Sequence, residues 1–454
     1  MPETRSADEP DAGSRPDSGA GRSWLRPIRN AGVLLTGRSV QAVASLAALA
    51  LAARALGSEA FGSLVLLHGF AVTVAALAKF QSWQAVLRYG APALEDRDMP
   101  RLGRLLKFCL LLDGASAVIG VAVVLAAIGP ALRLFGIPME LADAARAYGT
   151  VVLFMMLNST PTGVLRLLDR FDLISVQSTV APLLRLVGSA ALLLWGGGLI
   201  EFLVVWFVSA ALGRVILCAF AVFALVRRDI LGRLDLSLQG VARPEPGIWR
   251  FVAGTNVNGS LRLAQSQLGV LAVGWLVGPA AAGMFRIATQ FADLLVKPNN
   301  KLLVPAIYPE LTRLAAQQRF QERADMVRRT ILFAGGVSAV LLALLVVAGE
   351  PLIALAAGHE FADAYPTMVC LAVAGLIGAW TFPLEPLLVA DGRVAETVAV
   401  RTLATAAYLG LLYALLPALG VIGAGVAGIA YSAICAGLFV AFYLGSARRA
   451  VAQA

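Results

Sequence analysis

Charged residues are scarce in this chain of 454 amino acids. They make up 14% of it, whereas soluble globular domains usually contain about 25%. Hydrophobic residues account for 59%, and the mean hydropathy is +0.79. The composition therefore excludes a soluble globular protein and indicates a membrane protein with many spans.

Histidine and cysteine are also rare. There are two histidines and four cysteines, and the cysteines stand singly in apolar runs: His68, His359, Cys109, Cys218, Cys370 and Cys435. No pair has the spacing of metal ligands or of a redox motif. We therefore expect no metal site and interpret the cysteines as small core residues.

The sequence lacks every motif that would indicate an enzyme. It contains no P-loop, no Ser/His/Asp grouping and no nucleotide-binding domain. We expect a protein that is not an enzyme, holds no cofactor and does not consume ATP. Coupling to H⁺ or Na⁺ stays open. The net charge of +9 does not indicate nucleic-acid binding, because the cations fall in short loops between apolar segments.

Residues 1–30 are predicted to be a disordered cytoplasmic tail. The stretch up to residue 23 is rich in Pro, Ser, Gly and Asp and has no apolar run of the kind found in signal peptides. Targeting to the membrane therefore falls to the first span.

Twelve apolar segments follow, each of about the 20 residues that a membrane-spanning helix needs. They lie near residues 31–53, 63–87, 105–127, 147–168, 174–194, 200–226, 250–276, 284–308, 330–348, 366–390, 396–416 and 420–445. Most Lys and Arg of the connections fall on the side of the two termini, which predicts that both termini are cytoplasmic. The sequence thus predicts an all-α polytopic protein.

The chain also repeats itself. Segment 56–64 (LGSEAFGSL) aligns with 277–285 (VGPAAAGMF), so that Gly57 stands opposite Gly278 and Gly62 opposite Gly283. Chance alignment of apolar sequence is the alternative, but Pro130 and Pro351 keep the same offset of 221 residues. Two six-helix lobes with the same orientation follow, with the substrate site between them near the middle of the membrane.

This repeat divides the chain into five parts. We expect the tail over 1–30, an N-terminal lobe over 31–226 and a cytoplasmic linker over 227–249. A C-terminal lobe over 250–445 and a cytoplasmic end over 446–454 complete the chain.

Basic residues lie inside the predicted spans, where each would cost about 2.5–3.5 kcal/mol if it faced lipid. They are Arg38, Lys79, Arg185, Arg214, Arg262, Arg286, Lys297 and Lys301. Most must face protein, a water-filled cavity or the bilayer interface. A cavity lined by cations predicts an anionic cargo.

The span near 284–308 carries the clearest polar stripe. Arg286, Gln290, Asp293, Lys297 and Lys301 follow helical spacing and share one face. The two lysines would offer donors to a phosphate or a sugar. The alternative is a structural ion pair between Asp293 and Lys297.

Polar positions on spans 1, 2 and 7 extend this interpretation. The residues predicted to bind cargo are Arg38, Lys79, Arg262, Lys297, Lys301, Gln41, Gln265 and Gln290, and those predicted to carry a coupling ion are Asp293 and Glu385. Arg185 and Arg214 stand on otherwise apolar spans, where helix packing or headgroup contact is expected. Arg286 is expected to reach the interface from the outer end of its span.

Three segments resemble a known family: RALGSEAFGSLVLL after the first span, and VGPAAAGMFRIATQFADLLV followed by PAIYPELTRLAAQ around the eighth. They are similar to Wzx-type polysaccharide flippases of the superfamily that also holds multidrug and toxic compound extrusion transporters and lipid II flippases. The resemblance implies a V of two lobes around a cavity lined by spans 1, 2, 4, 7, 8 and 10. It also implies a location in the bacterial inner membrane and an undecaprenyl-pyrophosphate-linked oligosaccharide as cargo, moved by alternating access.

Two alternatives stay open. The first is a cation-coupled exporter of drugs or metabolites that uses Asp293 and Glu385. The second is a membrane scaffold that does not transport and that holds a polysaccharide polymerase and glycosyltransferases together. The abundance of basic residues in the predicted cavity favours the flippase, and membrane lipids and those enzymes are its expected partners.

Overall fold

The computed structural model describes residues 25–234, 240–241, 244–298, 313, 317, 320–390 and 393–453. Within these ranges, side chains are described except at 25–39, 254–266, 295–298, 320, 323, 390, 394 and 445–453. The predicted tail up to residue 24 and part of the predicted linker lie outside the described residues.

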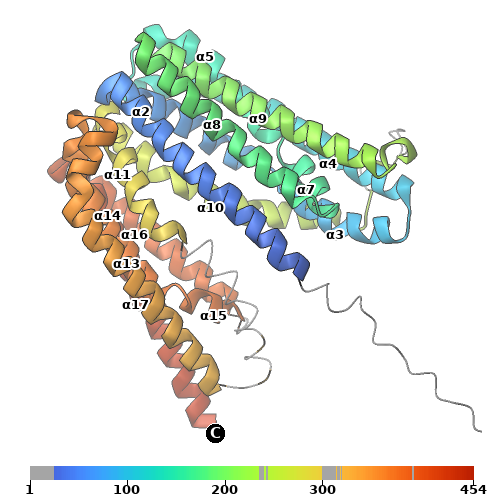
Figure 1. Cartoon of the computed structure of the whole chain (residues 1–454). Helices are drawn as coiled ribbons and strands as arrows, with labels where there is room; N and C mark the ends of the chain where they lie inside the picture. The colour runs from blue at the N-terminus through green and yellow to red at the C-terminus, as the bar shows by residue number, and fades with distance from the viewer. Residues whose placement is uncertain are drawn as a thin grey trace, which may run out of the picture.

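The described chain contains helices and no strand (Figure 1). The N-terminal lobe consists of α2 (Leu25–Ala78), α3 (Ser82–Glu95), α4 (Met99–Phe135), α5 (Ala142–Gly149), α6 (Val151–Met156), α7 (Ser159–Leu167), α8 (Phe171–Trp195) and α9 (Leu199–Arg227). The C-terminal lobe consists of α10 (Ile248–Leu276), α11 (Pro279–Pro298), α13 (Phe320–Ala357), α14 (Tyr365–Thr381), α15 (Leu384–Ala390), α16 (Val394–Leu419) and α17 (Val421–Gln453). The predicted all-α fold with two lobes is confirmed.

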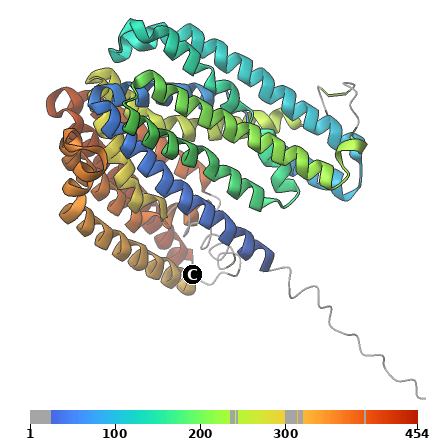
Figure 2. The same ribbon diagram turned by 45° about the horizontal axis from the view of Figure 1, so that its top comes forward.

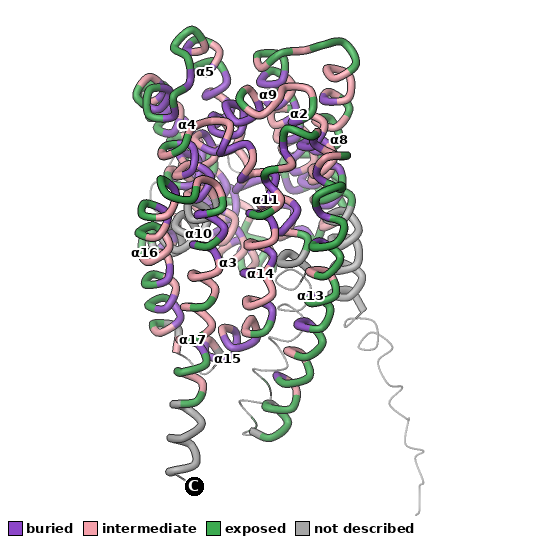
Figure 3. The backbone as a smooth tube through the Cα atoms, turned by 90° about the vertical axis from the view of Figure 1, so that its left-hand side faces the viewer, coloured by how far each residue is buried: buried purple, intermediate pink, exposed green. Residues whose placement is uncertain are grey.

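Eight helices within the described residues are long and apolar enough to cross a membrane. The predicted span near 147–168 corresponds to α6 and α7, which a break separates, and those near 250–276 and 284–308 correspond to α10 and α11, whose side chains are described only in part. Large hydrophobic side chains are exposed on the outer helices, among them Phe333, Val340 and Val347 of α13. Figure 3 shows this exposed face running along α13. Apolar residues facing outward are what a lipid environment requires.

The first two predicted spans form one long element with a sharp bend. Gly57 has φ +72°, a left-handed conformation that favours glycine, so the chain turns there within α2. Its repeat partner Gly278 also has a positive φ, at the turn between α10 and α11. The paired glycines of the sequence repeat therefore mark corresponding turns in the two lobes.

Two helix breaks face one another inside the N-terminal lobe. The chain leaves helical geometry between α2 and α3 and between α6 and α7. Ser159 links the breaks, since its hydroxyl donates to the carbonyl of Phe80 (3.2 Å) and accepts from the amide of Trp83 (3.2 Å). Backbone groups freed by a break in a membrane helix need such replacement partners.

Asp113 stabilises the same region. Its buried carboxylate accepts hydrogen bonds from the Ser82 hydroxyl (2.6 Å), the Thr160 hydroxyl (2.7 Å) and the Thr160 amide (2.9 Å). One carboxylate thus joins α4 to the first residues of α3 and α7. Hydrogen bonds to charged groups are each worth about 1.5–3 kcal/mol, so this acid is a structural residue.

The two lobes meet at one end and diverge toward the other, as Figures 1 and 2 show. At the meeting point, which we call the apex, Gly62 of α2 lies against the backbone of Pro279 at the start of α11. The Arg54 guanidinium donates to the carbonyl of Leu355 (2.9 Å), and Glu360 accepts from the amide of Ser58 (3.1 Å). Glycine permits this close approach because it has no Cβ.

The apex yields a prediction. A Cβ at Gly62 would lie 1.8 Å from the Pro279 carbonyl oxygen, so Gly62→Ala must push the lobes apart. We expect the free energy of unfolding to fall by about 1–3 kcal/mol, which is the usual cost of overpacking. The change is measured as a lower thermal unfolding temperature of the purified protein. Gly129→Ala in α4 is the matched control, because its Cβ would meet no atom within 4 Å. Equal unfolding temperatures for the two variants would contradict the close packing described here.

Candidate functional site

Of the eight predicted cargo-binding residues, five have side chains that the structure does not describe. Only the helical backbone is described for four of these five: Arg38, Arg262, Gln265 and Lys297. The fifth, Lys301, lies outside the described residues. Their assignment stays a prediction. The described ones are Gln41, Lys79 and Gln290.

A cavity of about 140 Å³ lies where the lobes meet. The N-terminal lobe contributes residues of α2, α8 and α9 to its wall, and the C-terminal lobe contributes residues of α10 and α11. The polar and aromatic side chains that line it are Ser45, His68, Arg185, Trp206, Gln267, Arg286 and Gln290. We call it the interlobe cavity. It has room for several water molecules or for a small anion.

Arg185 is held rigidly on the wall that α8 and α9 provide. Its Nε donates to the Ser209 hydroxyl (3.0 Å), and its guanidinium lies over the Trp206 ring, 4.8 Å from the centroid. The indole N–H of Trp206 is itself buried and has no partner among the described residues. His68 meets the Tyr148 hydroxyl (2.6 Å) and packs edge-on against Trp206. These contacts fix the arginine but leave donors unused.

Arg286 faces Arg185 from the other lobe. It makes no hydrogen bond or ion pair with any residue that the structure describes, and the two guanidinium groups repel one another electrostatically. No carboxylate lines the described wall of this cavity. Arg286 also interacts electrostatically with Asp293, which is not part of this wall. Two cations in a partly enclosed space whose described wall holds no carboxylate favour binding of an anion that carries more than one charge.

The expectation for Arg286 is therefore corrected, and that for Arg185 is extended. Arg185 does pack against helix α9, as expected, but it also lines the interlobe cavity. Arg286 lies in this cavity and was expected at the bilayer interface. Gln290, one turn further along α11, also lines this cavity, and its binding of cargo stays a prediction. Asp293 was predicted on the same face as Arg286 and Gln290, but it lines a separate cavity of the C-terminal lobe.

Lys79 and Arg214 lie together at the helix breaks of the N-terminal lobe. Arg214 donates to the side-chain oxygen of Asn158 (3.1 Å), which stands between α6 and α7. Lys79 occupies the break after α2 and interacts electrostatically with Arg214 and Asp113. Neither residue, nor Gln41, is among those that line the interlobe cavity. Arg214 thus helps to hold a helix break.

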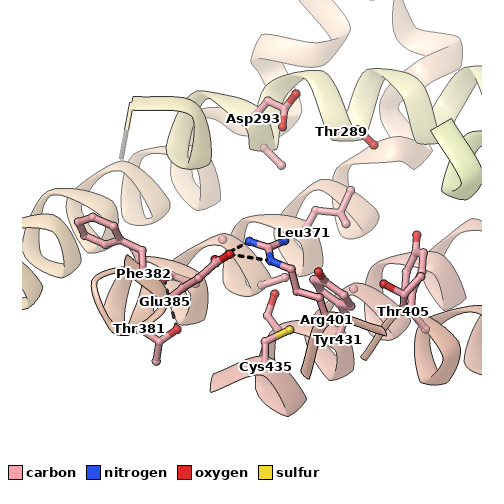
Figure 4. Close-up of a pocket in the computed structure, with 18 of the residues that line it drawn as sticks. Thr289, Asp293, Leu371, Thr381, Phe382, Glu385, Arg401, Thr405, Tyr431 and Cys435 are labelled. Atoms are coloured by element: carbon pink, nitrogen blue, oxygen red, sulfur yellow. Dashed lines mark hydrogen bonds and ion pairs between the residues drawn. The ribbon is translucent and has the colours of Figure 1, made fainter. Parts of the chain in front are cut away.

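A larger cavity of about 480 Å³ lies within the C-terminal lobe, between α11, α14, α16 and α17. We call it the C-lobe cavity. Figure 4 shows Thr289 and Asp293 on one wall and Glu385, Arg401 and Tyr431 on the facing wall. The two carboxylates predicted to carry a coupling ion therefore line one cavity, although they lie on different elements.

Glu385 is paired with an arginine that the sequence reasoning missed. Arg401 of α16 donates from Nε (2.9 Å) and from Nη2 (2.5 Å) to its two carboxylate oxygens. Arg401 falls inside the predicted span 396–416, and that position was a signal that a partner acid should exist. Asp293 lies on the facing wall and is not part of this pair.

Comparison with known sequences gives two matches. The profile of the family described as polysaccharide biosynthesis protein matches residues 28–315. The inner membrane protein YghQ of Escherichia coli (strain K12) is 35% identical over 341 residues, which cover 74% of this chain and 94% of that protein.

Comparison with solved structures shows the fold. An inward-facing multidrug resistance MATE family transporter of the MOP superfamily superposes with a TM-score of 0.74 at 17% identity, covering 93% of this chain and 99% of the other. The lipid II flippase MurJ in an inward closed conformation gives 0.68 at 12% identity, with 91% and 87% covered. The outward-facing MATE conformation gives 0.64 at 17% identity, with 94% and 96% covered.

The C-lobe cavity yields a prediction about Glu385 and Arg401. Either Glu385→Arg or Arg401→Glu alone places two like charges together. Each should lower the free energy of unfolding by about 1–3 kcal/mol, which is measured as a lower thermal unfolding temperature. The double variant Glu385→Arg/Arg401→Glu restores an ion pair and should recover most of the loss. Additive losses in the double variant would show that the two side chains do not interact.

Proposed function

Because the chain belongs to the polysaccharide biosynthesis protein family, we propose that it is a flippase for an anionic, polyprenyl-pyrophosphate-linked oligosaccharide in the inner membrane. The fold of MOP-superfamily transporters supports a transport function. The observation that carries the proposal is the pair of arginines, Arg185 and Arg286, in the interlobe cavity. The described wall of this cavity contains no carboxylate.

The chemistry of the cavity suits a pyrophosphate. Guanidinium groups present planar forks of N–H donors that match phosphate oxygens, and such charge-assisted bonds are about twice as strong as neutral ones. Arg185, Arg286 and the indole N–H of Trp206, which has no partner among the described residues, would together supply donors from both lobes. Gln267 and Gln290 add uncharged amide groups at the edge of the site.

The arrangement of the lobes fits alternating access. With the termini on the cytoplasmic side, as the distribution of Lys and Arg predicts, the closed apex around Gly62 is periplasmic and the lobes diverge toward the cytoplasm. Cargo would then enter from the cytoplasmic leaflet. Since Arg185 and Arg286 belong to different lobes, a bound pyrophosphate replaces their repulsion by two attractions. It thereby favours states in which the lobes close on the cargo.

The remaining parts of the proposal concern partners and energy. The flippase would make and break no covalent bond and would take its cargo from glycosyltransferases and pass it to a polysaccharide polymerase. Asp293 is the candidate for H⁺ or Na⁺ coupling, because it lines the C-lobe cavity and Glu385 is engaged by Arg401.

A second candidate, cation-coupled export of drugs, is favoured by one observation. The larger cavity carries Asp293 and Glu385, and carboxylates attract cationic compounds. The bidentate bond to Arg401 neutralises one of the two, which weakens this candidate.

The proposal predicts the effect of removing the two arginines. In cells that depend on this protein for surface polysaccharide, Arg185→Gln and Arg286→Gln should each lower export, and the double variant should abolish it. Loss of one charged contact costs about 1.5–3 kcal/mol, roughly ten- to a hundred-fold in cargo affinity. Export is measured as polysaccharide on the cell surface, with the amount of protein in the membrane measured in parallel.

The matched control is Arg133→Gln, at an exposed position near the end of α4. It removes the same charge away from the cavity and should leave export unchanged. Normal export by the double variant, at normal protein levels, would refute the flippase site and favour a scaffold. Accumulation of ethidium in cells with Asp293→Asn, with polysaccharide export intact, would favour the drug exporter instead.

A further inference from the structure

We infer that reciprocal capping of helix ends across the apex forms a latch that holds the two lobes together, on one side of the apex only. The latch consists of three contacts, each between a residue of α2 and a residue of the C-terminal lobe: Arg54–Leu355, Ser58–Glu360 and Phe61–Phe361. The inference rests on alternating access, which is part of the proposed function, but it does not depend on the anion site.

The bend in α2 creates a helix start at the apex. Gly57 interrupts the helical geometry, so the backbone N–H groups that follow it have no partner one turn earlier. The N–H of Ser58 donates instead to the carboxylate of Glu360 (3.1 Å), which lies in η4 (His359–Ala364) of the C-terminal lobe. An anion is favourable at a helix start because the helix dipole is positive there. An acid of one lobe thus caps a helix of the other.

Arg54 makes the reverse contact. Leu355 lies in the last turn of α13, where backbone carbonyls have no intrahelical donor. The guanidinium of Arg54 donates to the Leu355 carbonyl (2.9 Å), and a cation is favourable at this negative end of the helix dipole. Each lobe therefore gives one charged side chain and receives one. Separation of the lobes at the apex must break both interactions.

An aromatic contact stands beside the two hydrogen bonds. The rings of Phe61 in α2 and Phe361 in η4 meet edge to face, with their centroids 5.6 Å apart and their planes at 87°. Their exposed fractions are 0% and 1%. Opening of the apex would uncover both rings, so burial of their apolar surface adds to the stability of the closed apex.

The sequence repeat shows that the latch has no counterpart on the other side of the apex. At the offset of 221 residues, Ser58 corresponds to Pro279 and Glu360 corresponds to Met139. Proline has no N–H to donate, and methionine has no carboxylate to accept a hydrogen bond. In the described structure no hydrogen bond joins Pro279 and Met139. Both partners of this bond are thus missing together.

The aromatic contact is also confined to one side. Phe61 corresponds to Ala282, and Phe361 corresponds to Glu140 of η1 (Met139–Leu141). Glu140 is exposed, whereas Phe61 and Phe361 are buried. The lobes are therefore tied by η4 and α2 along one edge of the apex. The corresponding edge, with η1 and the start of α11, lacks these contacts among the described residues.

The test measures the distance between the lobes near the apex in the absence of cargo. Leu194 at the end of α8 and Leu419 at the end of α16 are exposed and belong to opposite lobes. Each is replaced by p-acetylphenylalanine and labelled with a hydroxylamine nitroxide, which leaves the four native cysteines unlabelled. Pulsed double electron–electron resonance of the full-length protein in lipid nanodiscs then gives the fractions of molecules with a closed and with an open apex.

Removal of the latch should raise the ratio of open to closed apex. Glu360→Ala leaves the helix after Gly57 without its cap, so we expect the ratio to rise about 2- to 30-fold. Arg54→Ala removes a cation from the end of α13, for which we expect about 2- to 5-fold. The double variant should exceed either single variant, because the two bonds stabilise different helix ends.

Conservative variants and matched controls separate a latch from general damage. Glu360→Gln keeps an oxygen that accepts from the Ser58 amide but loses the charge, and Arg54→Lys keeps a charged donor, so both should raise the ratio less than the alanine variants. Glu140→Ala in η1 and Arg133→Ala near the end of α4 remove the same kinds of charge from the side without a latch. They should leave the ratio as in the wild type.

Three outcomes would overturn the latch. An unchanged ratio in Arg54→Ala/Glu360→Ala shows that the contacts persist in both conformations and act as a hinge. An equal rise in the two controls shows that the effect is not confined to one side. If Glu360→Ala does not fold, Glu360→Gln is measured in its place, and a wild-type ratio there has the same meaning. Export by variants of the anion site is a separate measurement, so the latch and the proposed cargo fail independently.

Discussion

The low dielectric of the membrane interior governs the arrangement of charged residues in this protein. A charge that faces lipid is so costly that each ionisable group must find a partner or a cavity. Asp113 finds three hydrogen-bond donors at the helix breaks, and Glu385 finds Arg401. Arg185 and Arg286 instead share a cavity in which the described wall offers no acid. Their positive charge is thus left available for a ligand, and this distinguishes a binding site from a structural ion pair.

The repeat explains how a cavity between two lobes can open and close. Gly57 and Gly278 occupy corresponding turns, and Gly62 and Gly283 lie near one another where the lobes touch. Contacts at this apex involve backbone atoms in close approach, so they tolerate little change in side chains. The arginines lie deeper, one on each lobe, and their separation changes whenever the lobes pivot about the apex. Binding of an anion and movement of the lobes are therefore coupled by geometry.

Sequence reasoning recovered the fold because hydropathy, turn glycines and loop charges are local properties. Apolar segments of about 20 residues were enough to predict the spans, and Gly and Pro residues that recur at a constant offset were enough to predict the two lobes. The site was less accessible, since a lone arginine on an apolar span looks the same whether it packs against a neighbouring helix or faces the other lobe. Arg185 and Arg286 differ from Arg214 only in their tertiary surroundings. The position of Arg401 inside a span was visible in the sequence, but its pairing with Glu385 depends on how α15 and α16 pack.

Helix α11 lines both cavities. Neighbouring residues of a helix are about 100° apart around its axis, so Gln290 lines the interlobe cavity while Thr289 lines the C-lobe cavity. Asp293 of the C-lobe cavity still interacts electrostatically with Arg286 of the interlobe cavity, so the charges of the two cavities are not independent. A charged ligand that binds in one cavity therefore changes the electrostatic environment of the other.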